Sequence, residues 1–420
     1  MNKSSDKINP WYWISSLYLA EGIPYIVVIT VSAILYKRME ISNSELALYT
    51  SWLYLPWVIK PLWSPIVDLF KTKRWWITTM QLVIGTGLAG VALSLPGPDF
   101  FRYSLVFFWL LAFSSATHDI AADGFYMIGL HPKDQAYFVG IRNTFYRLAL
   151  IVGQGGAVML AGQLEKQMPV AYAWAIAIGF LSVLFILFFI YHLFVLPRPT
   201  EDHSAASGKN IWQEFWDTFA SFFRKDHIGI ALAFMLLFRL AESQLLKLAS
   251  PFMLDERAAG GLGLSTSVVG FIYGTVGVIA LALGGITGGI LIARNGLKRW
   301  IWWMTAAMNL PNLVYVWLAH AQPENILLIS SCVAVEQFGY GLGFTAYTLF
   351  LILFSAGKYK TAHYAICTGF MALGMMLPGM ISGYIQEAKG YPRFFLWVML
   401  CTIPAFIVVR YLRIPEKEQL

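Results

Sequence analysis

The sequence predicts an all-α integral membrane protein with twelve spanning helices arranged as two related halves of six. Composition is the first observation: 58% of the 420 residues are hydrophobic and only 13% are charged, whereas soluble proteins carry about 25% charged residues. The second observation is that twelve apolar runs are long enough to cross a bilayer core of about 30 Å. The third is a pair of short sequence matches between the two halves.

The spans set the organisation of the chain. We expect them at 11–36, 46–69, 75–95, 103–129, 136–162, 171–196, 227–253, 265–292, 299–319, 326–354, 360–385 and 391–412. The first run has no small-residue cleavage site after it, which favours an uncleaved helix over a signal peptide. The one long polar stretch then divides the chain into an N-terminal half at 1–196, a cytoplasmic linker at 197–226 and a C-terminal half at 227–420.

The linker ends in an amphipathic segment. Aromatic residues recur there at helical spacing, a pattern typical of a helix lying in the membrane interface. These residues are Trp212, Phe215, Trp216, Phe219 and Phe223. The three cysteines, Cys332, Cys367 and Cys401, match no disulfide or metal-ligand spacing and are interpreted as packing residues.

Basic residues predict the orientation. Nineteen of the 30 lysines and arginines, Arg142 among them, are assigned to the termini and to the loops on the same side, and seven to the opposite loops. Because positive charge is enriched on the cytoplasmic side, both termini are expected there. The remaining four, Lys60, Arg147, Arg239 and Lys247, fall within predicted spans.

Two repeats support an internal duplication. Leu19-Ala20-Glu21 in the first span recurs as Leu240-Ala241-Glu242 in the seventh, and the junction Lys73-Arg74-Trp75 recurs as Lys298-Arg299-Trp300. Both matches fall at the same helix number of their half, at offsets of 221 and 225 residues. Duplicated halves of this kind are typical of secondary transporters.

Embedded acids mark the candidate functional site. Charge inside a bilayer is costly and usually faces a wet cavity. Acids occur in spans 1, 4, 7 and 10 and are the candidates for proton coupling: Asp119, Asp123, Glu21, Glu242 and Glu336. Helices 1, 4, 7 and 10 line the central cavity in the major facilitator arrangement. The alternative for the fourth span is that it ends early and leaves its acids at the interface.

Further polar residues within the spans are candidates for substrate binding. They are Arg147, Asn143, Gln154, Lys60, Arg239, Tyr126, Tyr25, Tyr340 and His118. Arg147 needs an anionic partner, for which Asp119 or Asp123 is available before substrate arrives. The alternative is a structural polar seam between helices. Enzymatic chemistry is not indicated, because Gly341-Leu342-Gly343 precedes Phe344 rather than an aspartate and no metalloprotease or serine-nucleophile motif occurs.

Several motifs resemble the AmpG-type muropeptide permeases of the major facilitator superfamily. They are Glu21-Gly22-Ile23-Pro24, the run KPLWSPIVD at 60–68, the spacing Asp119-x-x-x-Asp123 and Tyr146-Arg147-Leu148. The chain departs from the family pattern at His118 and Glu21. The resemblance places a gate motif at Asp68 and Arg74, with Arg299 as its counterpart in the second half.

The resemblance implies a proton-coupled importer in the cytoplasmic membrane. The expected substrate is an anhydromuropeptide, an amino-sugar disaccharide (GlcNAc-1,6-anhydro-MurNAc) with or without its peptide. The expected chain is a monomer in the lipid bilayer, without cofactor, metal or nucleic-acid partner. An importer of another solute, such as a siderophore or a different oligosaccharide, is the alternative, and a transport-inactive sensor or scaffold is a third class.

Overall fold

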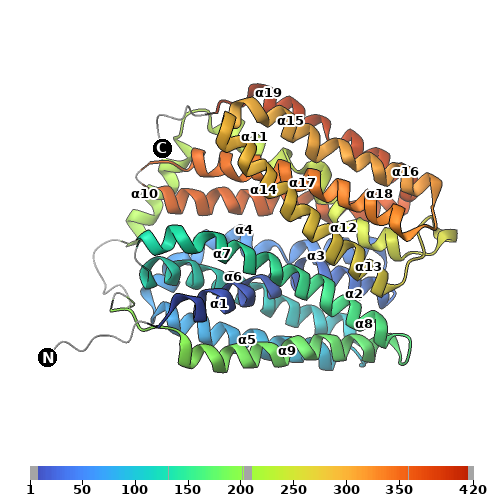
Figure 1. The fold of residues 1–420 in the computed structure, drawn as a ribbon, viewed down its shortest axis with the longest axis horizontal. Coiled ribbons are helices and arrows are strands. Elements are labelled where there is room, and N and C mark those ends of the chain that lie inside the picture. The colour runs from blue at the N-terminus through green and yellow to red at the C-terminus, as the bar shows by residue number, and fades with distance from the viewer. Residues whose placement is uncertain (1–7, 131, 201, 203–210, 358, 415–420) are drawn as a thin grey trace. The chain divides into compact units, whose positions relative to one another are not determined.

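The computed structural model describes residues 8–130, 132–200, 202, 211–357 and 359–414, and every regular element within these ranges is a helix (Figure 1). Nine of the described helical segments are long and apolar enough to cross a membrane. The last of these, Lys360–Tyr411, contains two predicted spans because the chain kinks at Gly390, where φ is 71°. The remaining two predicted spans are present as interrupted helices, so the twelve expected positions are all helical.

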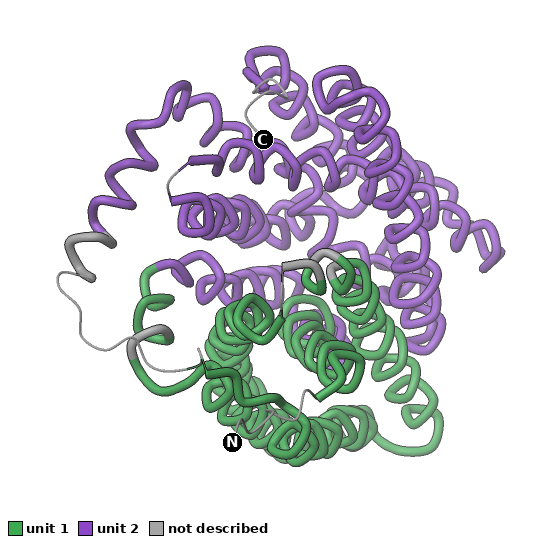
Figure 2. The backbone as a smooth tube through the Cα atoms, turned by 60° about the vertical axis from the view of Figure 1, so that its left-hand side comes forward, with its two compact units in different colours: residues 1–31, 62–209 green, residues 32–61, 210–420 purple. Residues whose placement is uncertain are grey.

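Two groups of helices form two compact units, coloured separately in Figure 2. Unit 1 comprises residues 1–31 and 62–209, and unit 2 comprises residues 32–61 and 210–420. This grouping differs from the division by sequence, because residues 32–61 pack with the C-terminal half. Within unit 2, α3 packs against α18 and α2 packs against α12.

The helices of unit 1 are α1 (Pro10–Ile26) with the π-helical turn η1 (Val27–Val31), α5 (Lys73–Ser94), α6 (Phe100–Gly129), α7 (Pro132–Leu150), η2 (Ile151–Ala157), α8 (Val158–Leu164) and α9 (Val170–Val195). The unit also holds the second part of α4 (Leu55–Leu69).

The helices of unit 2 are α2 (Ser32–Arg38), α3 (Asn43–Trp52), the first part of α4, α10 (Ile211–Phe223), α11 (Ile228–Leu237), α12 (Leu240–Leu254), η3 (Arg257–Ala259), α13 (Thr266–Phe271), η4 (Ile272–Gly277), α14 (Val278–Asn295), α15 (Leu297–Asn309), η5 (Leu310–Asn312), α16 (Leu313–Ala321), α17 (Ile326–Phe354), α18 (Lys360–Leu400) and α19 (Ile403–Tyr411).

Polar caps fix where several helices begin. Asn9 accepts from the backbone N–H of Trp11 at 3.1 Å, and Thr72 accepts from that of Trp75 at 3.0 Å. Ser42 does the same for Glu45 at 3.2 Å and donates to the Glu45 carboxylate. Each cap satisfies a backbone N–H that has no partner within its own helix.

π-Helical turns change the register of two membrane-spanning segments, Pro10–Arg38 and Gly140–Leu164. The turns η1 and η2 pack against each other in unit 1. Gln154 lies inside η2 and is 5% exposed, whereas Asn143 on α7 is exposed. A π-turn inserts an extra residue and rotates the following side chains. Gln154 is thus buried within the π-turn, whereas Asn143 lies exposed on the helix before it.

Glycines let α17 approach its neighbours. A Cβ at Gly339 would meet the backbone oxygen of Ala307, and one at Gly341 would meet that of Leu281. Close packing of helix backbones is thus the role that these contacts give to the glycine run. At these two positions neighbouring backbone occupies the space that a ligand would need.

The linker helix α10 docks on unit 2. Phe222 is fully buried and lies 5.5 Å from the His363 ring, while Trp216 and Phe223 are 64% and 44% exposed. The exposed aromatics fit the predicted interfacial face; the side chains of Trp212 and Phe215 lie outside the described residues. After α10, Lys225 donates to the carbonyls of Phe354 and Ala356 at 2.8 and 2.7 Å, and burial lowers the pKa of Lys225.

Candidate functional site

A cluster of three acids lies inside unit 1. Gly22 allows α1 to approach α7 closely, since a Cβ there would lie 2.6 Å from that of Ala149. This contact packs the neighbouring Glu21, which is 5% exposed, into the unit. The carboxyl groups of Glu21 and Asp119 lie within hydrogen-bonding reach of each other, and Glu21 Oε2 has no partner among the described residues. Two carboxyl groups form a hydrogen bond only when one of them carries a proton.

The third acid of this cluster, Asp123, is neutralised by a cation. Arg142 Nη1 lies 2.9 Å from Asp123 Oδ1, and the Tyr18 hydroxyl donates to the same oxygen at 3.3 Å. The guanidinium also stands over the Tyr18 ring, 4.6 Å from its centroid. The sequence predicted Arg147, five residues after Arg142, as the partner of Asp119 or Asp123. The sequence interpretation assigned Arg142 to the cytoplasmic end of the helix and so missed it.

Unit 2 contains a second acid cluster with different surroundings. Glu242 and Glu336 are each 1% exposed and lie close enough to interact electrostatically. Neither carboxylate oxygen of Glu242 has a hydrogen-bond partner among the described residues. Glu336 accepts from the side-chain amide of its neighbour Gln337 at 3.0 Å. Two buried acids thus share this region, and no cation lies within salt-bridge distance of either in the part of the chain that the structure describes.

Arg239 precedes Glu242 on the same helix. It occupies a break between α11 and α12, with φ −106° and ψ 19°, and is 6% exposed. Its guanidinium donates to the Tyr340 hydroxyl and stands over the rings of Tyr340 and Phe344, at 5.3 and 5.1 Å. The structure therefore brings two of the predicted binding residues, Arg239 and Tyr340, into contact.

A polar network explains why residues 32–61 belong to unit 2. Lys37 forms an ion pair with Asp255 at 2.6 Å and donates to Asn43 at 2.9 Å. Asn43 in turn donates to Gln386 at 2.8 Å, and Tyr391 donates to Asp255 at 2.6 Å. These bonds join α2 and α3 to the end of α12 and to α18.

Other predicted residues have local contacts. His118 is fully buried and faces α5, where it lies 3.1 Å from the Gln81 amide. The Tyr126 hydroxyl donates to the backbone oxygen of Gln135. Tyr25 lies near Tyr146, with ring centroids 6.5 Å apart. Lys60 and Arg147 are partly exposed on α4 and α7. The contacts of His118 and Tyr126 favour packing roles, so neither enters the site proposed below.

Two of the predicted gate residues lie in the first turns of helices, Arg74 in α5 and Arg299 in α15. Arg74 donates to the backbone oxygens of Leu193 and Leu196 at the end of α9. Arg299 is exposed at the start of α15. The side chain of Asp68 lies outside the described residues, so the pairing expected of the gate remains a prediction.

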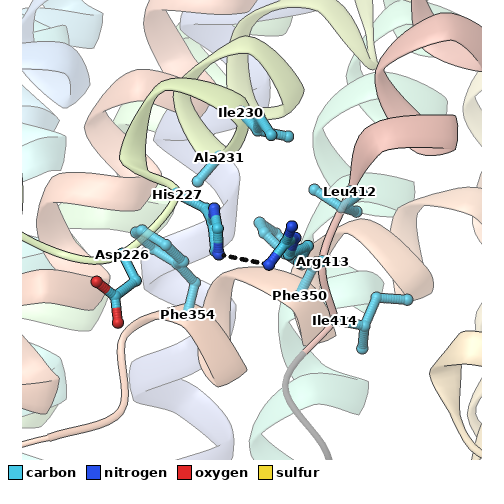
Figure 3. A pocket seen from close by; sticks show the side chains of 9 residues that line it. All are labelled: Asp226, His227, Ile230, Ala231, Phe350, Phe354, Leu412, Arg413 and Ile414. Atoms are coloured by element: carbon cyan, nitrogen blue, oxygen red, sulfur yellow. Dashed lines mark hydrogen bonds between the residues drawn. The ribbon is translucent and has the colours of Figure 1, made fainter.

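Figure 3 shows a pocket elsewhere in unit 2, where His227 Nε2 and Arg413 Nη1 lie 3.2 Å apart. The pocket is lined by Asp226, His227, Ile230, Ala231, Phe350, Phe354, Leu412, Arg413 and Ile414. None of the predicted binding or coupling residues is among them. It is therefore separate from both acid clusters.

The fold and the buried charges define a multi-pass membrane protein with ionisable groups inside its spans, as solute pathways require. The chain belongs to the Major Facilitator Superfamily, whose family model matches residues 14–359. It is therefore a secondary transporter of small molecules and not an enzyme.

Individual relatives resemble most of the chain. It is 24% identical to the anhydromuropeptide permease of Escherichia coli K12, covering 94% of this chain and 77% of that one. It is also 24% identical to a Rickettsia conorii protein that carries the name AmpG 4, with 94% of each covered. The solved structure of a D-xylose-proton symporter superposes with a TM-score of 0.72 at 11% identity, covering 97% of this chain and 98% of that one.

Proposed function

We propose that this protein imports anhydromuropeptides across the cytoplasmic membrane and is driven by protons. The substrate assignment rests on similarity to a permease of that name over 94% of the chain. The coupling assignment rests on one arrangement, the buried carboxyl group of Glu21 within hydrogen-bonding reach of that of Asp119.

The proton is assigned to that pair for a chemical reason. A shared hydrogen bond between two acids holds one proton, and losing the proton leaves two negative charges that repel. Asp123 is a weaker candidate because Arg142 and Tyr18 already stabilise its ionised form. Among the acids that the sequence offers for proton coupling, the contacts favour Asp119 with Glu21. In this proposal Glu242 and Glu336 are assigned to substrate binding rather than to proton coupling.

The network around Lys37 and Asp255 supplies a gate in this proposal. Its residues lie at helix ends that the charge distribution assigns to the periplasmic side. It links helices of the first half to helices of the second. Alternating access requires these bonds to break whenever the periplasmic side opens.

Uptake into proteoliposomes tests the proposed function. Purified full-length protein is reconstituted and the accumulation of a radiolabelled anhydromuropeptide is followed with and without an inward proton gradient. One proton moving through 100 mV supplies about 2.3 kcal/mol, which corresponds to an about 50-fold concentration ratio.

We expect accumulation that collapses when the gradient is dissipated. Uptake that only equilibrates, with or without the gradient, would contradict proton coupling. If no muropeptide is taken up and a siderophore or an unrelated oligosaccharide accumulates instead, the proposed substrate is wrong and that solute is the substrate.

A further inference from the structure

A buried lysine in unit 2 has no counter-charge among the residues that the structure describes. Lys247 lies on α12 and is 4% exposed. Its ammonium donates to Thr50 Oγ1 at 3.0 Å and stands 5.2 Å from the centroid of the Tyr54 ring. No carboxylate lies within 4 Å of it among the described residues. A cation removed from water without an anionic partner is strongly destabilising, so a structural role alone does not account for it.

Arg239, in the same membrane-spanning segment Ile228–Leu254, also has no carboxylate within salt-bridge distance among the described residues. Its contacts are aromatic rings and a hydroxyl, and its Nε has no partner among the described residues. Glu242 is near enough to affect its charge but forms no salt bridge with it. Other cations of the described chain show a different pattern: Lys37 is paired with Asp255 and Arg142 with Asp123.

Tyr54 connects the two cations. It contacts the ammonium of Lys247 and also lies within electrostatic range of Arg239. Both cations lie in the membrane-spanning segment Ile228–Leu254 and are eight residues apart, which corresponds to about 12 Å along a helix axis and about 80° around it. One carboxylate does not bridge two charges at that separation, whereas two anionic groups on one extended molecule do.

We propose that Arg239 and Lys247 form a two-point anion site, which binds two carboxylate groups of the transported solute when α3 separates from α12. The inference rests on the proposed function and narrows its substrate to the peptide-bearing conjugates, because a peptide containing acidic residues supplies several carboxylates. Thr50 then acts as the resting partner that the first carboxylate displaces from Lys247.

A binding experiment with matched ligands tests the site. Purified full-length protein in detergent is titrated calorimetrically with an acidic-peptide muropeptide and with the same conjugate after amidation of its carboxylates. The variants are Lys247→Gln and Arg239→Gln, with Lys247→Arg as the charge-preserving control. Thermal unfolding of each variant checks folding, and Lys247→Gln is expected to unfold no lower than wild type because it removes an unpaired buried charge.

We expect wild type to bind the acidic conjugate at least about tenfold more tightly than the amidated one. Either glutamine variant should remove that preference, while Lys247→Arg retains most of it. Equal loss on both ligands, or no loss on either, overturns the anion site and leaves the proposed function intact.

A second measurement covers the case in which wild type binds neither conjugate and the proposed substrate is wrong. Linear dicarboxylic acids of increasing length and matched monocarboxylic acids are then added during thermal unfolding at constant ionic strength. A stabilisation by the long dicarboxylates that disappears in Lys247→Gln supports the anion site. No stabilisation of wild type by any dicarboxylate overturns it.

Discussion

Leu19-Ala20-Glu21 and Leu240-Ala241-Glu242 begin the two halves in the same way, yet the glutamates have different neighbours. Glu21 lies within hydrogen-bonding reach of the Asp119 carboxyl group, whereas Glu242 has no hydrogen-bond partner among the described residues. The residue that precedes the shared tripeptide also differs, being Tyr18 in the first half and Arg239 in the second.

Both units nevertheless contain an arginine over a tyrosine ring. In unit 1 the tyrosine, Tyr18, comes from α1 and Arg142 from α7, with 4.6 Å between guanidinium and ring centroid. In unit 2 Arg239 lies between α11 and α12 and Tyr340 on α17, at 5.3 Å. The first span of each half thus supplies one partner, the tyrosine in unit 1 and the arginine in unit 2. The duplicated scaffold therefore supports two chemistries: an ion pair beside a carboxyl pair in unit 1, and unpaired cations beside buried acids in unit 2.

The largest effect is expected from breaking the carboxyl pair of unit 1. Glu21→Gln and Asp119→Asn should each reduce gradient-driven accumulation from up to about 50-fold to simple equilibration, because neither variant can release the shared proton. Counterflow exchange, which needs no net proton movement, should survive in at least one of them. The unit 2 variant Glu242→Gln should keep its response to the gradient. If Glu242→Gln uncouples transport and Glu21→Gln does not, the roles of the two units are reversed.

A smaller effect is expected from the ion pair. Arg142→Gln removes the ion pair with Asp123 and should lower the free energy of unfolding by about 1 kcal/mol, a modest value since the two side chains are 28% and 36% exposed. Adding Asp123→Asn should recover most of the loss. Thermal unfolding of the two single variants and the double variant measures this coupling, and additive losses would show that the pair contributes nothing to stability.

The smallest effects compare the two tyrosines. Tyr18→Phe keeps the ring under Arg142 and removes one long hydrogen bond to Asp123, so a change below about 0.5 kcal/mol is expected. Tyr340→Phe removes a hydroxyl bonded to the buried Arg239, and should cost about 1–2 kcal/mol. Unfolding midpoints of the two variants give the comparison directly. A larger loss for Tyr18→Phe would mean that unit 1, not unit 2, depends on its tyrosine for charge stabilisation.

The sequence by itself determined where the helices lie and which of them carry charged residues. Hydrophobic runs must be long enough to cross a bilayer, and an acid within such a run stands out against it. For this reason the twelve positions, the acids in spans 1, 4, 7 and 10 and the aromatic linker helix were all readable from the chain. Family membership followed from local motifs such as the run at 60–68.

Only the tertiary structure decided which charges meet. The π-turn at 151–157 shifts the register of its span in a way that helical periodicity does not predict. The ion pair between Arg142 and Asp123 was likewise not expected, because the sequence assigned Arg142 to the cytoplasmic end of its helix. Residues 32–61 pack with the C-terminal half through Lys37 and Asn43, contacts that join residues more than 200 positions apart. Pairing across such distances depends on how the helices pack, and a linear pattern of apolar residues contains no information on it.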